Sequence, residues 1–437
     1  MDGHAYKQRK PRESAHFQLV EDHFETLERI WEERYLERYG FWRSHYMRVI
    51  WEYLDCGDLK NGFARIRCAD CGHEYLLPFS CKRRHFCPSC HERRVLEFGE
   101  FLVSEVLADV PHRQWVFSIP KMLRPWFMRD RKLLGEMCAI VWKLLSRFIK
   151  AETDGDEATD AHPAAVMSIQ TFGEQVNFNP HIHVICADGC FKGDGIFYEA
   201  WAHDTSPFQK AFADEIFKLL TKKGMSVSQV EMMCSWQHSG FSVYRSSQIL
   251  AGDREGLERL ASYIVRCPFT VSRMTYIKES GEVSYRGKTS GVAKPYSALD
   301  FLARLVIQIP SPHEQMVRYY GYYSNKSRGL RKKIDTDGDV KEVLPAKKLT
   351  SISWARLIAK VYLENPLICP RCKGQMRIIA CIEEDAVIAK ILRHRGLWEL
   401  PVAHAPPPLE FARIAQMDNT PDDYSELLPS EYEYEAC

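Results

Sequence analysis

Three stretches in the middle of the chain alternate apolar and polar residues in the way that predicts β-strands. They are 113–120 (RQWVFSIP), 164–173 (AAVMSIQTFG) and 181–189 (HIHVICADG). A short segment ending in NFNP separates the second stretch from the third. We therefore expect these two strands to be antiparallel neighbours in one sheet.

Apolar residues recur at helical spacing in much of the remaining chain. This period predicts helices within 16–55 and over 91–110, 123–150, 206–223, 254–265, 297–309 and 352–364. The break PSPH at 310–313 suits a helix start, so the cluster YYGYY at 319–323 is also expected to lie on a helix. Strands and helices in this order predict an α+β fold.

Length and cysteine content narrow the class of protein. The 437 residues allow several domains, and no apolar run is long enough to span a bilayer. The first residues are polar and basic and lack the apolar core of a signal peptide, so we expect a cytoplasmic enzyme. Fifteen cysteines in such a chain favour metal binding over disulfides.

The net charge of +1 hides an uneven distribution. Residues 410–437 contain eight acidic residues and one basic residue, so this tail carries −7 and the rest of the chain carries +8. A moderately basic body is compatible with binding nucleic-acid phosphates. Scattered charges that only keep the surface soluble are the alternative.

The strongest local motif is a pair of C-x-x-C knuckles. Cys68/Cys71 and Cys87/Cys90 are separated by fifteen residues, a spacing that fits a tetrahedral, structural zinc ribbon. Buried thiols without metal are the alternative. Further ligand candidates lie nearby, so the set of four stays open: Cys56, Cys81, His85 and His91.

Basic residues lie on both sides of the Cys87/Cys90 knuckle, in CKRRHFC and HERR. Phe86, in the first of these segments, is a candidate for stacking on a base. A solvated charged face is the other interpretation. The candidate phosphate contacts are Lys82, Arg83, Arg84, Arg93 and Arg94.

A third C-x-x-C pair, Cys369/Cys372, lies near the C-terminal end of the chain. Cys381 and His394 follow it as candidates to complete a second zinc site. The sequence does not show a closed set of four ligands here.

His181 and His183 flank a single apolar residue in a predicted strand, so their imidazoles project from the same face and can share a divalent metal. Histidines in strands are often ordinary core or surface residues, and the pair alone does not decide between these. Gln170 on the preceding strand is the first choice for a third, oxygen ligand. The alternatives in the following turn are Glu174, Asn177 and Asn179.

Tyr319 and Tyr323 have i, i+4 spacing, so on a helix their phenols share a face. Aromatic residues at this spacing usually pack in a core. Here cations and small polar residues surround them, which favours contact with a phosphate. The cations counted as DNA-binding candidates are Arg318, Lys326, Arg328 and Arg331.

The order of these motifs resembles that of the IS91-type transposases, which belong to the HUH (histidine–hydrophobe–histidine) single-strand endonucleases. The similarity runs from about Cys56 to Cys381. It rests on FSCKRRHFCPSC, RQWVFSIP, NFNPHIHV, GDREGLERLASYIVR, DFLARLVIQIPSPHEQMVRYYGYYSNKSRG and WARLIAKVY followed by CPRC.

The resemblance implies an RRM-like antiparallel sheet flanked by helices, with Mg²⁺ or Mn²⁺ held by His181 and His183. It implies that Tyr319 attacks single-stranded DNA of the transposon ends and target, leaving a 5′-phosphotyrosine and a free 3′-OH. Tyr323 becomes the second nucleophile, and Tyr320 and Tyr322 become packing groups.

Two rivals remain at this level: a rolling-circle replication initiator or relaxase with the same chemistry, and a zinc-dependent DNA-binding regulator without catalysis. The expected domains are an N-terminal helical segment (1–55), a zinc-binding, DNA-contacting module (56–104) and a catalytic domain (105–345). A C-terminal helix with the third knuckle (346–400) and an acidic, proline-containing tail (401–437) complete the chain.

Overall fold

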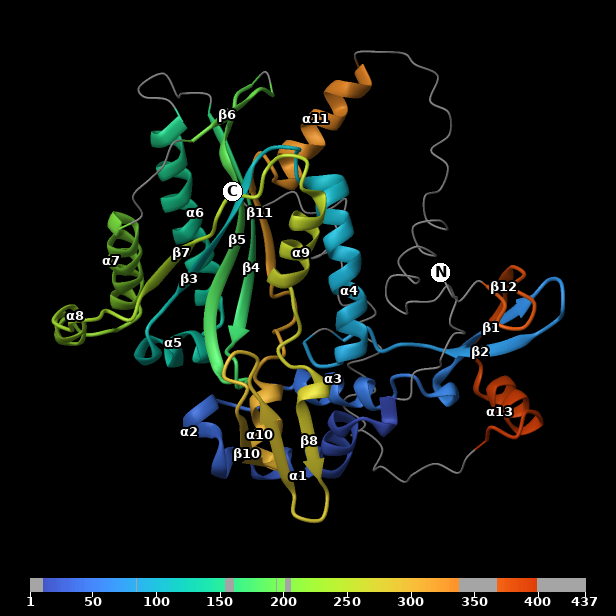
Figure 1. Ribbon diagram of the computed structural model, residues 1–437. Helices are drawn as coiled ribbons and strands as arrows, with labels where there is room; N and C mark the ends of the chain where they lie inside the picture. Colours follow the sequence, from blue (N-terminus) through green and yellow to red (C-terminus); the bar gives the residue numbers. More distant parts are fainter. Residues whose placement is uncertain are drawn as a thin grey trace.

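The structure is a computed structural model that describes residues 11–83, 85–153, 161–193, 195–200, 206–337 and 368–398 (Figure 1). The predicted helix at 352–364 and the acidic tail lie outside the described residues. The described part is a mixed α+β protein with antiparallel sheets. None of its helices has both the length and the apolar character needed to cross a membrane.

A six-stranded sheet forms the centre, in the order β11-β4-β5-β3-β7 with β6 added to β5, and every pair is antiparallel. The three predicted strands are confirmed as β3, β4 and β5, and β4 and β5 are antiparallel neighbours as expected. The bounds are β3 His112–Ser118, β4 His162–Phe172, β5 Phe178–Phe191, β6 Phe197–Glu199, β7 Ser242–Arg245 and β11 Val317–Gly321.

Helices cover both faces of this sheet, which explains why β4 and β5 are buried along nearly their whole length (Figure 1). One face packs on α6 (Lys132–Thr153) and α7 (Ser206–Lys222), and Phe208 and Phe212 of α7 contact Trp115 and Phe117 of β3. The other face packs on α4 (Pro88–Phe101) and α9 (Arg254–Ile264). Alternate residues of one strand therefore enter two different apolar clusters, as Met167 and Val166 do.

The long helix predicted over 123–150 is divided in two. α5 (Arg124–Arg129) ends at Asp130, and α6 begins two residues later. The Asp130 carboxylate accepts a hydrogen bond from the backbone N–H of Lys132 at 3.1 Å. The Asp130 side chain thus replaces a backbone carbonyl as the partner of this N–H, which interrupts the helix between α5 and α6.

The tyrosine cluster does not lie on a helix, and this prediction is wrong. Val317–Gly321 pairs with β4 as an edge strand, and the next helix, α11 (Asn325–Asp337), starts after the tyrosines. Gly321 ends the strand with φ +60°, and a Cβ there would lie 1.9 Å from the carbonyl oxygen of Pro163. β-branched and aromatic residues favour this strand, and only glycine fits the close approach.

The N-terminal helices are not separate from the central domain. Leu27 of α1 and Ile50 of α3 belong to the same apolar cluster as Leu134 of α6 and Phe301 of α10. A three-stranded meander, β8-β9-β10, joins them below the central sheet (Figure 1). The bounds are α1 Ala15–Arg34, α2 Leu36–Tyr39, α3 His45–Leu54, α8 Val227–Cys234, β8 Met274–Ile277, β9 Glu282–Arg286, β10 Ala293–Ser297 and α10 Ala298–Val306.

A small peripheral unit combines residues from both ends of the chain. Its sheet has the order β12-β1-β2, and α13 packs beside it (Figure 1). The predicted separation between a module at 56–104 and a knuckle at 346–400 therefore does not hold, since β12 pairs along β1. The bounds are β1 Phe63–Cys68, β2 Glu74–Pro78, β12 Met376–Ile382 and α13 Asp385–His394.

Candidate active site

The two histidines of the HIH motif project side by side from β5. Their ring centroids lie 4.8 Å apart, and His181 and His183 are both buried, with 8% and 3% of their surface exposed. Burial lowers the pKa of His181 to about 4 and that of His183 to about 2. Both imidazoles are therefore neutral near pH 7, which is the form that binds a metal.

Hydrogen bonds orient both rings. Nδ1 of His181 lies 2.7 Å from the carbonyl oxygen of Asn179, which only accepts, so Nδ1 carries the proton and Nε2 keeps a lone pair. Nδ1 of His183 meets the side-chain amide of Gln114 on β3 at 2.9 Å, and Nε2 is buried without a hydrogen-bond partner. The atom of Gln114 that faces Nδ1 is its amide nitrogen, which donates, so in this arrangement the ring proton lies on Nε2. Exchanging the amide oxygen and nitrogen of Gln114 would place the proton on Nδ1 and leave the lone pair of Nε2 for a metal.

Gln170, the predicted third ligand, lies directly opposite His181 in the β4–β5 register. Its amide nitrogen donates to the carbonyl oxygens of Tyr263 and Ile264, at 3.2 and 2.7 Å. Oε1 therefore has a fixed direction, and it is buried without a hydrogen-bond partner. Buried polar atoms rarely lack partners, so this oxygen and Nε2 of His183 fit a site for a divalent cation.

Within the described residues, no third histidine, cysteine or carboxylate completes a ligand group with this pair. Among the other oxygen candidates, the Glu174 carboxylate accepts from the backbone N–H of Ser290 at 2.8 Å. Oδ1 of Asn179 is buried without a hydrogen-bond partner, like Oε1 of Gln170, and Asn179 lies two residues before His181 on β5. Gln170 and Asn179 are thus the two oxygen donors that the geometry offers.

Arginines, rather than carboxylates, surround the histidines. Arg266 stacks 4.8 Å above the ring of Tyr263, which in turn packs on His183 with centroids 5.3 Å apart. Arg124 and Arg266 both act to lower the pKa of His181, and each has a buried Nε without a partner. In the described part of the chain neither guanidinium forms an ion pair with a carboxylate, so both remain available to an anion.

A pocket opens beside Gln170, between the central sheet and α4. Its walls come from α4, β4, α9 and β11, so it forms only when these elements pack together. Arg94 of α4 and Arg266 after α9 give it positive charge, and Ile264 and Val317 are among its apolar walls. The sequence singled out Arg94 but not Arg266, Arg124, Tyr263 or Gln114, because only cross-strand and helix contacts bring these to the histidines.

Tyr319 lies on the same face of the sheet as the histidines. His183 pairs with Ser168 of β4, and Ser168 pairs with Val317 of β11, so these three share a face. Tyr319 is two residues beyond Val317 and projects from the same face. Two strand spacings and two residues along the strand put its Cα roughly 12 Å from that of His183. Its ring is half-buried, with the Arg328 guanidinium 5.4 Å from its centroid.

Tyr323 occupies a different environment from the one predicted. It follows the strand in a turn and is fully buried, and its hydroxyl accepts the N–H of Ala108 at 3.2 Å and meets Nε2 of His112 at 2.8 Å. Burial raises the pKa of Tyr323 well above its usual value. The i, i+4 argument for a shared face fails here, because the backbone between the two tyrosines is not helical.

The other two tyrosines are packing groups. Tyr320 points to the opposite face and stacks on Trp142 of α6, with centroids 5.1 Å apart. The Tyr322 ring stacks on that of Phe191, with centroids 3.8 Å apart. The guanidinium of Arg331 also lies over the Tyr322 ring, 3.6 Å from its centroid.

Several predicted DNA contacts are structural in this fold. Arg318 extends toward α6, where a Cβ on Gly135 would meet it at 2.8 Å, on the face away from Tyr319. Arg328 is buried and donates to the carbonyl oxygen of Tyr323 at 3.2 Å, and Arg331 donates to that of Tyr322 at 2.8 Å. Both arginines therefore hold the tyrosine turn. Lys326 is exposed at the start of α11.

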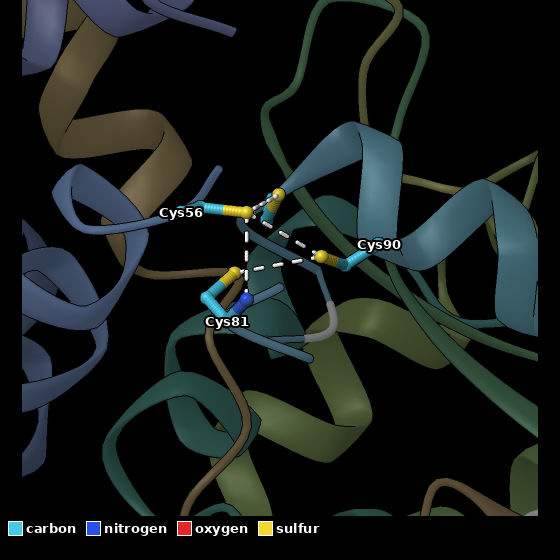
Figure 2. A group of neighbouring side chains, drawn as sticks. Cys56, Cys81 and Cys90 are labelled. Carbon is cyan, nitrogen blue, oxygen red and sulfur yellow. Dashed lines mark hydrogen bonds between the residues drawn. The ribbon is translucent and has the colours of Figure 1, made fainter. Parts of the chain in front are cut away.

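The cysteines form two groups of four, and neither is the predicted one. Cys56, Cys81, Cys87 and Cys90 converge, with Sγ–Sγ distances of 3.8 Å (Cys56–Cys87), 3.7 Å (Cys56–Cys90) and 3.6 Å (Cys81–Cys90). Figure 2 shows the sulfurs of Cys56, Cys81 and Cys90 directed at one another. Four sulfurs bound to one tetrahedral zinc at about 2.3 Å lie about 3.8 Å apart, so this group fits zinc.

The second group is Cys68, Cys71, Cys369 and Cys372. The two C-x-x-C pairs that the sequence joined into one ribbon thus belong to different groups. Cys56 and Cys81, which the sequence gave as spare candidates, complete the first group. Cys381 is exposed and, like His394, belongs to neither.

The remaining residues of the module pack rather than bind zinc. His91 Nδ1 accepts the backbone N–H of His85 at 3.1 Å, and its Nε2 lies 2.7 Å from the carbonyl oxygen of Val265. Phe86 is fully buried, so it does not stack on a base in this structure. Arg83 pairs with Glu52, Lys82 is exposed, and Arg84 lies outside the described residues. Arg93 and Arg94 both pair with Glu97.

Comparison with known proteins agrees with this arrangement. A family model described as "Transposase zinc-binding domain" matches residues 26–119, and one described as "Putative transposase" matches residues 164–330. The transposase for insertion sequence element IS801 from Pseudomonas savastanoi pv. phaseolicola is 22% identical over 374 residues, which are 78% of this chain and 85% of that protein.

A second relative is described as putative transposase y4qJ from Sinorhizobium fredii. It is 23% identical over 290 residues, 60% of this chain and 70% of that protein. No solved structure matches the chain. The zinc-binding match spans the first cysteine group, and the transposase match spans the HIH motif and the tyrosines. The chain belongs to the IS91 family of transposases.

Proposed function

We propose that this protein is a metal-dependent endonuclease and strand transferase that cuts and joins single-stranded DNA at transposon ends. The observation that carries the proposal is the position of Tyr319 on the same sheet face as His181 and His183. The antiparallel sheet with helices on both faces agrees with an RRM-like HUH fold. Such an enzyme works on chromosomal DNA in the cytoplasm.

In the proposed reaction, the phenol oxygen of Tyr319 attacks the phosphorus of a DNA phosphodiester. The bond from phosphorus to the 3′ oxygen breaks, and the 5′ end stays on the tyrosine. The phenol loses its proton and the 3′ oxygen gains one as it leaves as a hydroxyl, so no net proton is consumed. The phosphotyrosine retains the bond energy, so a 3′-OH can attack it and join strands without ATP.

His181, His183 and Oε1 of Gln170 would hold Mg²⁺ or Mn²⁺, which would supply positive charge to offset that of the phosphoryl oxygens. Arg266, fixed on the Tyr263 ring, presents a second positive charge on the same side of the sheet. Arg328 lies over the Tyr319 ring, where its charge favours the negative oxygen that attacks.

Tyr323 is the second nucleophile in this proposal, and the structure imposes a condition on it. Its hydroxyl first has to leave the buried contacts with Ala108 and His112. Arg328 and Arg331 hold the same turn through backbone carbonyls, so the turn has to move as a unit. The first cleavage by Tyr319 does not require that movement.

The test uses single-stranded oligonucleotides from the ends of the element, with Mg²⁺ or Mn²⁺. The wild type should form a covalent adduct that peptide mass spectrometry maps to Tyr319, and Tyr319→Phe should abolish it. His181→Ala should lose cleavage but keep most DNA affinity, since phosphate contacts supply that affinity. Tyr198→Phe, on a half-buried ring of β6 opposite Cys190 and thus seven residues along β5 from His183, is the matched control.

An adduct that maps to Tyr320 or Tyr322, or one that persists in the Tyr319→Phe, Tyr323→Phe double variant, contradicts the assignment. Equal loss of binding and cleavage in His181→Ala indicates instead that the histidines only stabilise the fold.

A further inference from the structure

We propose that Cys68, Cys71, Cys369 and Cys372 hold a second structural zinc that fastens the C-terminal end of the described chain to its N-terminal ribbon. This site is independent of the proposed DNA chemistry. It also extends beyond the matched zinc-binding domain, which ends at residue 119. Zinc here joins two segments that are about 300 residues apart in sequence.

The sulfur positions suit one tetrahedral ion. Sγ of Cys68 lies 3.4 Å from Sγ of Cys372, and Sγ of Cys71 lies 3.5 Å from Sγ of Cys369. Each pair joins one knuckle to the other, and all four sulfurs lie within 4.8 Å of one another. Each knuckle alone supplies only two thiols, so neither closes a site without the other.

The backbones of the two knuckles are shaped alike and meet closely. Cys68 N–H donates to the carbonyl oxygen of His73, and Cys369 N–H donates to that of Gly374, both at 2.8 Å. A Cβ on Gly374 would lie 1.9 Å from a carboxylate oxygen of Asp70 in the first knuckle. A side chain at 374 would therefore displace the Asp70 carboxylate, and its Cβ would lie 3.2 Å from Sγ of Cys372.

Strand pairing gives an independent reason for the same junction. β12 runs antiparallel to β1 from Cys68↔Met376 to Phe63↔Ile382, immediately beside the sulfurs. The register places Cys381 opposite Ala64, at the far end of the strand pair from the four thiols. Cys381 is thus excluded as a ligand by the strand register and not only by distance along the chain.

The apolar contact between the two segments is small. In the described residues it consists of two clusters of four buried residues each: Ile66, Cys68, Cys369 and Met376 beside the sulfurs, and Phe63, Leu76, Ile388 and Leu392 under α13. Along β12, Ile378 and Ile379 are about half exposed. Domains this small usually need a metal or disulfides to fold, and binding of zinc then supplies the folding energy.

Zinc in this site would link two segments that are far apart in sequence. The central sheet, the histidines and Tyr319 all lie between the two knuckles, so the zinc would hold β12 and α13 against β1 and β2. Because this zinc site is remote from the central sheet, its loss should free β12 and α13 and leave the central sheet intact (Figure 1).

The test is metal analysis of the full-length chain after dialysis, combined with hydrogen exchange. Wild type should hold two zinc ions per chain, and Cys372→Ser should hold one. In that variant, peptides over β1 and β12 should exchange at least tenfold faster, with β5 and α6 unchanged. Cys372→His should restore the second zinc, and Cys381→Ser, on β12, should keep both ions.

One zinc per wild-type chain, or two in Cys372→Ser, overturns the proposal. So does the loss of an ion in Cys381→Ser, because that cysteine then belongs to the site. Faster exchange throughout β5 in Cys372→Ser contradicts a peripheral zinc site. None of these readouts depends on DNA cleavage, so failure of the proposed function leaves them unaffected.

Discussion

The hydroxyl of Tyr323 lies 2.8 Å from Nε2 of His112, in the interior between the sheet and α4. Nδ1 of His112 lies 2.7 Å from the carbonyl oxygen of Val110, so Nδ1 carries the proton and Nε2 accepts from the tyrosine. The N–H of Ala108 donates to the same hydroxyl. The two tyrosines that share a motif are thus set apart: Tyr319 is half-exposed on the sheet, and Tyr323 is locked in a buried network.

Tyr323→Phe should destabilise the fold, whereas Tyr319→Phe should not. Losing the Tyr323 hydroxyl leaves Nε2 of His112 and the Ala108 N–H buried without a partner, which costs about 1–3 kcal/mol. Chemical denaturation of both variants measures this. The first cleavage should survive in Tyr323→Phe, and completed strand transfer should fall. Equal stability of the two variants contradicts the buried network.

Stability should decline in mild acid because several histidines are buried in the neutral form. Burial lowers the pKa of His112 to about 4, that of His45 to about 4 and that of His16 to about 3. Between these values and about 6.5 the unfolded chain binds more protons than the folded chain, so the free energy of unfolding falls as pH drops. Each histidine should contribute about 2 kcal/mol to the loss by pH 5.

The variant His112→Asn tests this through the change of the free energy of unfolding with pH, and not through the stability at any single pH. Unfolding measured at pH 7, 6 and 5 should show a smaller decline in His112→Asn than in wild type. The matched control is His238→Asn, at an exposed position, which should keep the wild-type slope. An unchanged slope in His112→Asn would mean that the pKa of His112 is the same in the folded and unfolded chains.

Arg266→Gln should slow DNA cleavage by about 10²-fold, because a charge-assisted contact in a dry site contributes several kcal/mol to the transition state. A neutral methylphosphonate at the scissile position should slow the wild type but have little added effect on Arg266→Gln. Arg259→Gln, exposed on the outer side of α9, is the control. Additive effects of the two changes indicate that Arg266 contacts a different phosphate or none.

Cys56→Ser should remove the zinc of the first cysteine group and lower the melting temperature of the main body. Cys56 and Cys87 lie in the same apolar cluster as Tyr53 and Phe86, so the zinc is built into the core. Structural zinc contributes roughly 10 kcal/mol in isolated zinc-finger peptides, and a loss of several kcal/mol is expected here. Cys234→Ser, at an exposed cysteine, should change neither quantity. Retained zinc with an unchanged melting temperature in Cys56→Ser would show that Cys56 is not a ligand.

The sequence alone determined features that depend on local periodicity. The alternation in 164–173 and 181–189 fixed two neighbouring strands, and with them the shared face of His181 and His183. The same reasoning put Gln170 on the neighbouring strand, and the register places it opposite His181. The C-x-x-C spacing predicted zinc knuckles, since a two-residue gap brings two thiols to one ion wherever the knuckle lies.

Tertiary structure decided which distant segments meet. Sγ of Cys68 lies beside that of Cys372 rather than that of Cys87, because β12 pairs with β1 after an intervening stretch of about 300 residues that no local pattern records. Tyr319 lies on a strand because β11 pairs with β4 at the edge of the sheet. The spacing of Tyr319 and Tyr323 in the sequence was equally compatible with a helix. Arg266 reaches the histidines only through Tyr263, by a contact between a helix end and a sheet face. Local sequence fixes the period of a segment, and the free energy of non-local packing selects its partner.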